Sequence, residues 1–379
     1  MDRTPFYAES GGQLGDIGSI SEPNDRIAIL DTKKENNLIV HLCDRLPENP
    51  MAQFSASVDD RRRADISANH SATHLLHEAL RTVLGNHVEQ KGSLVHPEYL
   101  RFDFSHFSKL TDTELASVSE MVNEKIRANL QLEEQRGISI QAAKEAGAMM
   151  LFGEKYGDSV RMITFGSSVE LCGGTHVKKT GDIGPFILRS EGAVAAGVRR
   201  IEAISSSAAD EYIKDELKQL NTVRELLKAK DAVKSLSEIL SKNNRLEKEI
   251  EVLIHEKAMR MKQEIKSSAE KIHGIHFIAT RVDLPAAALK DISFQLRNEL
   301  ENLFAVFGSV YAEKPSLTCI ISDSLIAEKN MNASTIIRNL ATEIKGKGGG
   351  QAFFATAGGT ELNGLVKALT LARNMIPAV

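Results

Sequence analysis

Asn69-His70-Ser71-Ala72-Thr73-His74 carries two histidines four residues apart. Apolar residues accompany it at helical spacing, and two histidines at i and i+4 of a helix offer their imidazoles to one point. A second segment, Leu171-Cys172-Gly173-Gly174-Thr175-His176, has two glycines that let the backbone aim Cys172 and His176 at the same point. Three imidazoles and one thiolate make a ligand set that suits Zn²⁺.

Two other interpretations of these segments are weaker than a zinc site. Paired histidines on a helix are common, but a Cys-Gly-Gly-Thr-His run has little packing rationale. A zinc peptidase is disfavoured because Ser71 stands where that helix motif carries its general-base glutamate. The pattern therefore predicts a metal centre of another kind, with the ligands His70, His74, Cys172 and His176.

Composition sets the class of protein. A chain of 379 residues is too long for one ordinary core, so we expect two or three domains, and 42% apolar with 26% charged residues is typical of a soluble globular protein. No apolar run has the length of a membrane span, and three widely spaced cysteines make no disulfide framework, so we expect a cytoplasmic location and no membrane partner. A net charge of −4 argues against nucleic-acid binding unless basic residues cluster locally.

The first two hundred residues mix strand and helix signals. Strand-like runs occur before residue 58, and the metal-site helix is expected to end at Gly85. Residues 99–104 alternate like a strand, and Thr111 with Glu114 forms a capping signal for a long helix. We expect an α+β domain built around a sheet.

Residues 206–273 differ in composition from the rest of the chain. They contain neither glycine nor proline, and 27 of the 68 are charged, with one apolar stripe at three- and four-residue steps. This predicts a coiled-coil-like helical arm, with a break at residues 228–231, rather than a surface helix packed on its own domain. The stripe toward Met259, Met261 and Ile265 is expected to be open to a second chain.

Strands and helices alternate again from residue 275, which predicts a compact α/β unit. Lys345-Gly346-Lys347-Gly348-Gly349-Gly350 is expected to be a loop whose backbone N–H groups and lysines could hold a phosphate. A tight turn without ligand is the alternative. The spacing is not that of a nucleotide-binding loop.

A resemblance to a known family covers the whole chain. His-Ser-Ala-Thr-His-Leu-Leu from His70 and the Cys-Gly-Gly-Thr-His run resemble the editing region of alanyl-tRNA synthetase, as do residues 4–13, 90–94 and 197–203. The resemblance implies an α+β multidomain protein whose parts are a partial small β-barrel (1–58), a zinc editing domain (59–205), the helical arm (206–273) and a C-terminal glycine-rich α/β domain that binds tRNA (274–379). Because Met1 directly precedes a motif that lies inside the barrel in that family, we expect part of the barrel to lie outside these residues.

The implied activity is hydrolysis of the ester that joins a wrong amino acid to the 3′ end of tRNA(Ala). An alanine pocket excludes glycine and serine poorly, because one methyl group gives only ~1–3 kcal/mol of discrimination, so a second, hydrolytic site is needed. The resemblance implies no aminoacylation core here, although the parent enzyme would ligate alanine to tRNA(Ala) with ATP. Two roles for zinc stay open: activating a water, or orienting the substrate through its amino group.

The resemblance also assigns the remaining site residues. Gln90 matches a position linked to recognition of the mischarged amino acid, and Gly11, Gly12 and Gln13 match a loop beside the site. Lys345 and Lys347 are expected to contact tRNA, while Arg199 and Arg200 suit either phosphates or a carboxylate such as Glu202.

Two rival interpretations remain open from the sequence. One is a free-standing editing protein that acts on tRNA(Ala) in trans, and the other is a non-catalytic zinc module that binds RNA. Hydrolysis of Ser-tRNA(Ala) would separate the second from an editing enzyme. A homodimer formed through residues 206–379 is a further expectation.

Overall fold

The structure is a computed structural model, and it describes residues 1–377 except 2, 24, 37, 151–156, 158 and 312. The chain divides into two compact units, Met1–Leu226 and Leu227–Val379. Among the residues described, no helix combines the length and apolar character needed to cross a membrane.

The first part of the chain is an antiparallel sheet of four strands in the order β3-β2-β1-β4. Its core is small and contains Phe6, Ile20, Ile27 and Ile29. The described strands leave β3 and β4 at the two edges, so the partial barrel stays a prediction. The strands are β1 (Gly18–Glu22), β2 (Asp25–Glu35), β3 (Leu38–Cys43) and β4 (Ser55–Val58).

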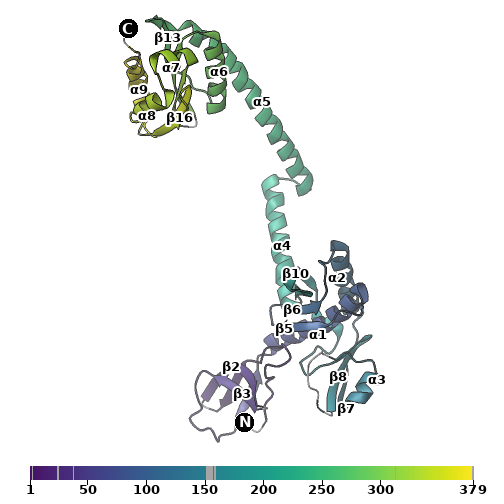
Figure 1. Ribbon diagram of the computed structural model, residues 1–379. Helices are drawn as coiled ribbons and strands as arrows, with labels where there is room; N and C mark the ends of the chain where they lie inside the picture. Colours follow the sequence, from purple (N-terminus) through teal and green to yellow (C-terminus); the bar gives the residue numbers. More distant parts are fainter. Residues whose placement is uncertain are drawn as a thin grey trace. The chain divides into compact units, whose positions relative to one another are not determined.

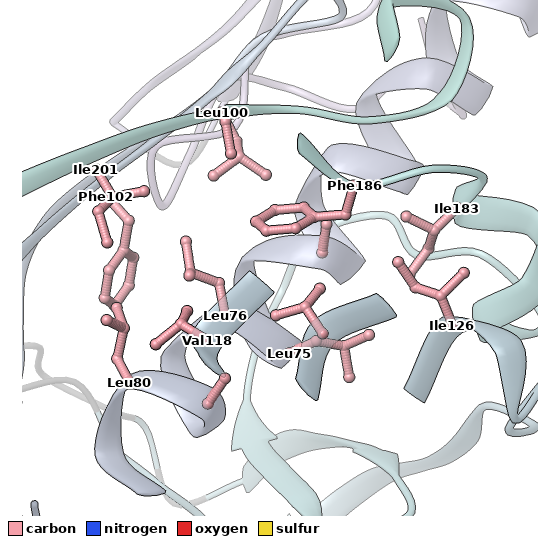
Figure 2. Packing of buried hydrophobic residues seen from close by; sticks show 14 of the residues in the cluster. Leu75, Leu76, Leu80, Leu100, Phe102, Val118, Ile126, Ile183, Phe186 and Ile201 are labelled. Atoms are coloured by element: carbon pink, nitrogen blue, oxygen red, sulfur yellow. The ribbon is translucent and has the colours of Figure 1, made fainter. Parts of the chain in front are cut away.

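Helix α1 (Asp60–Leu84) carries the predicted histidine pair. It begins where the side chain of Asp59 accepts a hydrogen bond from the Arg62 amide at 3.0 Å, and it ends at Gly85, whose φ of +114° favours glycine. Its apolar face enters the largest core of this unit, where Leu75, Leu76 and Leu80 are fully buried (Figure 2). This burial fixes the rotation of the helix and with it the direction of the histidines.

Two sheets and a second helix surround α1. The capping box of Thr111 and Glu114 starts α2 (Asp112–Arg127) as the sequence predicts, and α2 packs on α1. One sheet has the order β10-β11-β6-β5 and the other β7-β8-β9. The elements are β5 (Gln90–Val95), β6 (Leu100–Ser105), β7 (Glu133–Ser139), α3 (Ile140–Glu145), β8 (Ser159–Phe165), β9 (Ser168–Leu171), the 3₁₀ turn η1 (Thr180–Ile183), β10 (Ile187–Ala195) and β11 (Val198–Ile204).

The charged, glycine-free segment forms two helices, α4 (Ser206–Leu227) and α5 (Ala232–Ser267). The interruption falls where the sequence predicts it, and the side chain of Asp231 caps α5 by accepting from the Lys234 amide at 3.0 Å. The expectation that the stripe stays open toward Met261 and Ile265 is wrong. Ile265 is buried and Met261 packs beside it, because α6 of the same unit covers this end of α5.

The second unit is built on a six-stranded sheet in the order β12-β13-β14-β15-β17-β16, with β13 and β14 parallel and the other pairs antiparallel. Alternate residues of β14 enter different cores: Ala305 and Phe307 pack with residues of α6, whereas Phe304 and Val306 pack with residues of α8 and α9. In Figure 1, α6 lies on one side of this unit and α8 and α9 lie on the other. The elements are β12 (Glu270–Ile272), β13 (Ile275–Arg281), α6 (Ala286–Glu299), β14 (Leu303–Tyr311), β15 (Lys314–Ile321), α7 (Asp323–Lys329), α8 (Ala333–Ala341), β16 (Lys347–Gly350), β17 (Phe354–Gly358) and α9 (Gly364–Arg373).

Residues 347–350 of the glycine-rich stretch form the edge strand β16, so the expectation of a loop is wrong for these four residues, whereas Lys345 lies in the turn before the strand. The strand pairs antiparallel with β17, with Lys347 opposite Gly358 and Gly350 opposite Ala355. Close packing requires glycine at 348, since a Cβ atom there would overlap the side chain of Ala357. Sheet pairing therefore uses part of the backbone that a phosphate cradle would need.

Candidate metal centre

His70, His74, Cys172 and His176 lie together, with one possible ligand atom from each within 4.8 Å of all the others. Cys172 Sγ is 3.3 Å from Nε2 of His70 and 3.3 Å from Nε2 of His176. Four ligands in a tetrahedron about 2.0–2.3 Å from one ion are about 3.3–3.8 Å apart. The two sulfur–nitrogen separations of 3.3 Å lie in this range, and the four side chains are close enough together to hold one ion.

Each of the three imidazoles has a different group beside its Nδ1 atom. Gln13 Oε1 lies 2.7 Å from Nδ1 of His70, and Ser71 Oγ lies 3.2 Å from Nδ1 of His176. Glu170 Oε2 lies 2.5 Å from Nδ1 of His74, close enough for ion pairing although the contact lacks hydrogen-bond geometry. With a proton on each Nδ1, all three Nε2 atoms have a lone pair for a metal.

The hydroxyl of Ser71 fixes the tautomer of His176. It donates its proton to the carbonyl of Ser67 at 2.8 Å and accepts from the Val177 amide at 3.1 Å. Because its only proton is used, it can act toward His176 solely as an acceptor, so Nδ1 of His176 carries the hydrogen. Ser71 thus supports a ligand at the position where a zinc peptidase has its general base.

Gln13 holds His70 and the ligand loop at once. Its Oε1 accepts from the Thr175 amide at 2.9 Å, and its Nε2 donates to Thr175 Oγ1 at 3.0 Å. A backbone N–H can only donate, which fixes the orientation of the Gln13 amide and makes His70 the donor at Nδ1. Nε2 of His74 is buried and has no hydrogen-bond partner among the described residues, which is what a metal-binding nitrogen would show when the ion is left out of account.

The loop that carries Cys172 and His176 is held by Arg161. Its guanidinium donates to the carbonyl of Gly174 at 2.6 Å and to that of Cys172 at 3.1 Å, and it also binds Glu134 at 2.7 Å. The loop can approach His70 only because residue 174 is glycine, since a Cβ atom there would overlap the imidazole ring.

The charges in the cluster favour metal ligation. Burial opposes the thiolate, but the charges of His70 and His74 hold the pKa of Cys172 well below that of a free thiol. Burial and the charge of His70 lower the pKa of His176 to about 3, which keeps that imidazole neutral. Glu170 stays ionised despite its burial because His74 and His77 lower its pKa to about 2.

A cavity of about 450 Å³ opens beside the cluster. Ser10 and Gly11 line it, as does Gln90, so the structure brings these sequence-predicted residues to the metal site. Gly11 has φ of +60° and open space where a Cβ atom would lie, whereas Gly12 packs so closely on the backbone of Ser93 that a side chain would not fit. Gln13 is fully buried behind His70 and acts through that ligand.

The four predicted RNA-binding residues have different surroundings. Arg200 binds Asp103 through two hydrogen bonds of 2.6 and 2.8 Å, and Arg199 pairs with Glu191. The carboxylate partners are therefore Asp103 and Glu191 and not Glu202, and both ion pairs brace the sheet. Contact of the two arginines with RNA stays a prediction. Lys345 is exposed and lies 3.3 Å from Glu361, and Lys347 is exposed on β16.

Sequence reasoning missed Glu170, Arg161 and Ser71 as parts of the site. Glu170 stands two residues before Cys172 in β9, so its position could have been found from the ligand motif. No local signal marks Arg161, because the pairing of β8 with β9 places it beside the loop.

Three family models match this chain. Residues 160–202, which include Cys172 and His176, match the threonyl and alanyl tRNA synthetase second additional domain. Residues 1–61 match tRNA synthetases class II (A), and residues 274–377 match the DHHA1 domain. The first two of these matches identify a chain of the aminoacyl-tRNA synthetase class.

Curated relatives narrow this class. The chain is 49% identical over 378 residues to the alanine–tRNA ligase of Christiangramia forsetii and 51% identical over 367 residues to that of Bacteroides fragilis. The matches cover 99% and 96% of this chain, and 43% and 42% of those relatives. The chain belongs to the alanyl-tRNA synthetase family and spans less than half the length of these relatives.

A solved structure also matches part of the chain. It is the C-Ala domain from Aquifex aeolicus alanyl-tRNA synthetase, which is 20% identical and covers 29% of this chain and 99% of its own. The TM-score of 0.26 is too low to support an argument about the fold.

Proposed function

We propose that this chain hydrolyses the ester between a wrongly attached amino acid and the 3′ end of tRNA(Ala), acting on Ser-tRNA(Ala) and Gly-tRNA(Ala). The observation that carries the proposal is the three-histidine, one-cysteine cluster at the wall of a cavity of about 450 Å³, in a chain of the alanyl-tRNA synthetase family. The reaction would take place in the cytoplasm as part of protein synthesis.

The residues present suit zinc, held by Nε2 of the three imidazoles and by Sγ of Cys172. When bound, zinc supplies a Lewis acid beside the scissile ester. Ser10, Gly11 and Gln90 line the cavity, and in this proposal the backbone of Ser10 and Gly11 would lie close to the terminal adenosine and Gln90 would contact the amino acid. Arg161, Gln13 and Ser71 keep the ligands in place before substrate arrives.

The test is deacylation of seryl-, glycyl- and alanyl-tRNA(Ala) by the purified chain, with and without a zinc chelator. We expect rapid loss of serine and glycine, slow loss of alanine, and no activity in chelator. Elemental analysis should find about one zinc per chain. Stoichiometric zinc without hydrolysis of any ester would refute the deacylase and favour a zinc module that only binds RNA.

Cys172→Ala separates catalysis from binding. It should abolish hydrolysis of Ser-tRNA(Ala) while the affinity for tRNA stays within about threefold, because most of that affinity comes from phosphate contacts. Cys43→Ala is the matched control, since Cys43 lies in β3 outside the ligand cluster. Wild-type turnover by Cys172→Ala would remove the thiol from the mechanism.

We also propose that the second unit contacts the tRNA backbone through Lys345 and Lys347. Both side chains are exposed, Lys347 on the edge strand β16 and Lys345 in the turn before it. The double change to alanine should weaken tRNA binding and reduce the salt slope by roughly one for each lost contact. Lys290→Ala on α6 is the control, and equal slopes for both variants would show that the two lysines touch no RNA.

A further inference from the structure

A buried carboxylate joins the metal centre to a histidine that is not a ligand. Glu170 is 6% exposed; its Oε2 lies 2.5 Å from Nδ1 of His74 and its Oε1 accepts from Nδ1 of His77 at 2.9 Å. His74 and His77 are three residues apart on α1, so both imidazoles reach the same carboxylate from one helix face.

The three imidazole ligands differ in the charge of the group at Nδ1. His70 meets the amide oxygen of Gln13 and His176 meets the hydroxyl of Ser71, and both of these groups are neutral. Only His74 has an anion there. Zinc with one thiolate and three neutral imidazoles carries a net charge of +1, and burial makes an unbalanced charge costly, so Glu170 brings the site to neutrality.

His77 has no role as a ligand, yet it is almost fully buried. Its ring packs against Phe102 with the centroids 5.2 Å apart, and its Nε2 has no hydrogen-bond partner among the described residues. The contact that accounts for its position is the hydrogen bond from Nδ1 to Glu170. This bond holds the carboxylate in the rotamer that faces His74.

We propose that Glu170, held by His77, is a positioning residue of the metal centre. It keeps the proton of His74 on Nδ1, offers Nε2 to the metal and balances the charge of the ion. The inference rests on the metal centre of the proposed function, but it concerns affinity for the ion, which can be measured without any tRNA.

Glu170→Gln is the direct test, because it keeps the shape and removes the charge. Competition with a chromophoric chelator should show zinc binding about 10- to 100-fold weaker than in the unchanged chain, the usual loss for such partners. The visible spectrum of the Co²⁺-substituted protein should also shift. Glu78→Gln is the matched control: it removes a carboxylate that pairs with Lys125 from α1, the helix that carries His74 and His77, and it should bind zinc like the unchanged chain.

A second pair of variants covers the case in which Glu170→Gln fails to fold, as judged by circular dichroism. Asparagine at 77 keeps a donor close to the position of Nδ1, whereas leucine keeps bulk without a donor. His77→Asn should bind zinc within about threefold of the unchanged chain and His77→Leu about tenfold more weakly.

Each result decides the proposal. Affinity of Glu170→Gln within twofold of Glu78→Gln, or equal affinities of the two His77 variants, would overturn it. A chain that binds no zinc at all overturns both this inference and the metal centre, whereas a chain that binds zinc in the expected order and hydrolyses no ester overturns the deacylase alone.

Discussion

Gly174 and His70 are so close that a single added methyl group at residue 174 would overlap the imidazole ring, and it would also lie 2.6 Å from Oε1 of Gln13. Two segments about a hundred residues apart thus meet with no space between them. The tight approach explains why the ligand loop has a glycine there, and it provides a sharp test of the site.

Gly174→Ala should lose zinc, because the loop must move away from His70 and take Cys172 with it. Gly173→Ala is the matched control in the same loop, since a Cβ atom there meets nothing within 4 Å. We expect at least about a hundredfold weaker zinc binding by Gly174→Ala and near-normal binding by Gly173→Ala, measured by chelator competition. Equal affinities would show that the loop is not packed on His70.

Ser71→Ala should destabilise the first unit even without metal. The change leaves the buried Val177 amide without its acceptor, which costs about 1–3 kcal/mol, and removes the acceptor from His176. Thr82→Ala is the control, because the Thr82 hydroxyl also bonds to a carbonyl one turn earlier on α1 but is exposed. Denaturant unfolding in chelator measures both. If Ser71→Ala lowers the free energy of unfolding no more than Thr82→Ala does, the role given to the Ser71 hydroxyl is contradicted.

Ion pairs join the C-terminal end of α5 to α6, and they make the stability of the second unit depend on pH. Hydrogen bonds from Lys262 and Lys266 lower the pKa of Glu299 from 4.5 to about 2. A depressed carboxyl pKa contributes stability that is present above about pH 4.5 and is lost as pH falls toward about 2.

Glu299→Gln should remove this part of the acid sensitivity. Hydrogen exchange of α6 peptides, followed between pH 5 and pH 3, should quicken less in the variant than in the unchanged chain once intrinsic rates are corrected. Glu249→Gln is the control, because Glu249 pairs with Arg245 only within α5. The same acid response in all three proteins would rule out a role for Glu299.

The parts of the site that rest on local rules could be predicted from the sequence. The i, i+4 spacing of His70 and His74, the cap at Asp59 and the stop at Gly85 are all properties of one helix. The supporting groups depend on strand pairing instead: β8 and β9 pair with Met162 opposite Leu171, which brings Arg161 to the loop. A single sequence does not show such a register.

The second unit shows the same division. The alternation of strands and helices from residue 275 is visible in the sequence, but the glycines of residues 346–350 predict a loop, because glycine usually marks turns. In the structure, glycine lets the backbone of β16 lie close to β17, and this need arises from the packing of two strands and not from the local sequence. The covered end of α5 escapes prediction for a similar reason, since periodicity shows that a stripe exists but not which helix meets it.

The remaining stripe on α5 predicts association between two copies of the chain. Leu246, Ile250 and Leu253 follow one another at steps of four and three residues, and Ile250 and Leu253 are 52% and 63% exposed. Removing such side chains from water gives about 1.5–3 kcal/mol each, so two of them can change a dimer dissociation constant by tenfold or more.

We therefore expect sedimentation velocity of the full chain to show a dimer that forms as concentration rises. Ile250→Lys with Leu253→Lys should shift it to monomer, whereas Val252→Lys, which is 58% exposed on the opposite face, should not. A monomer at every concentration, or equal shifts in both variants, would leave the stripe as a surface that no second copy covers.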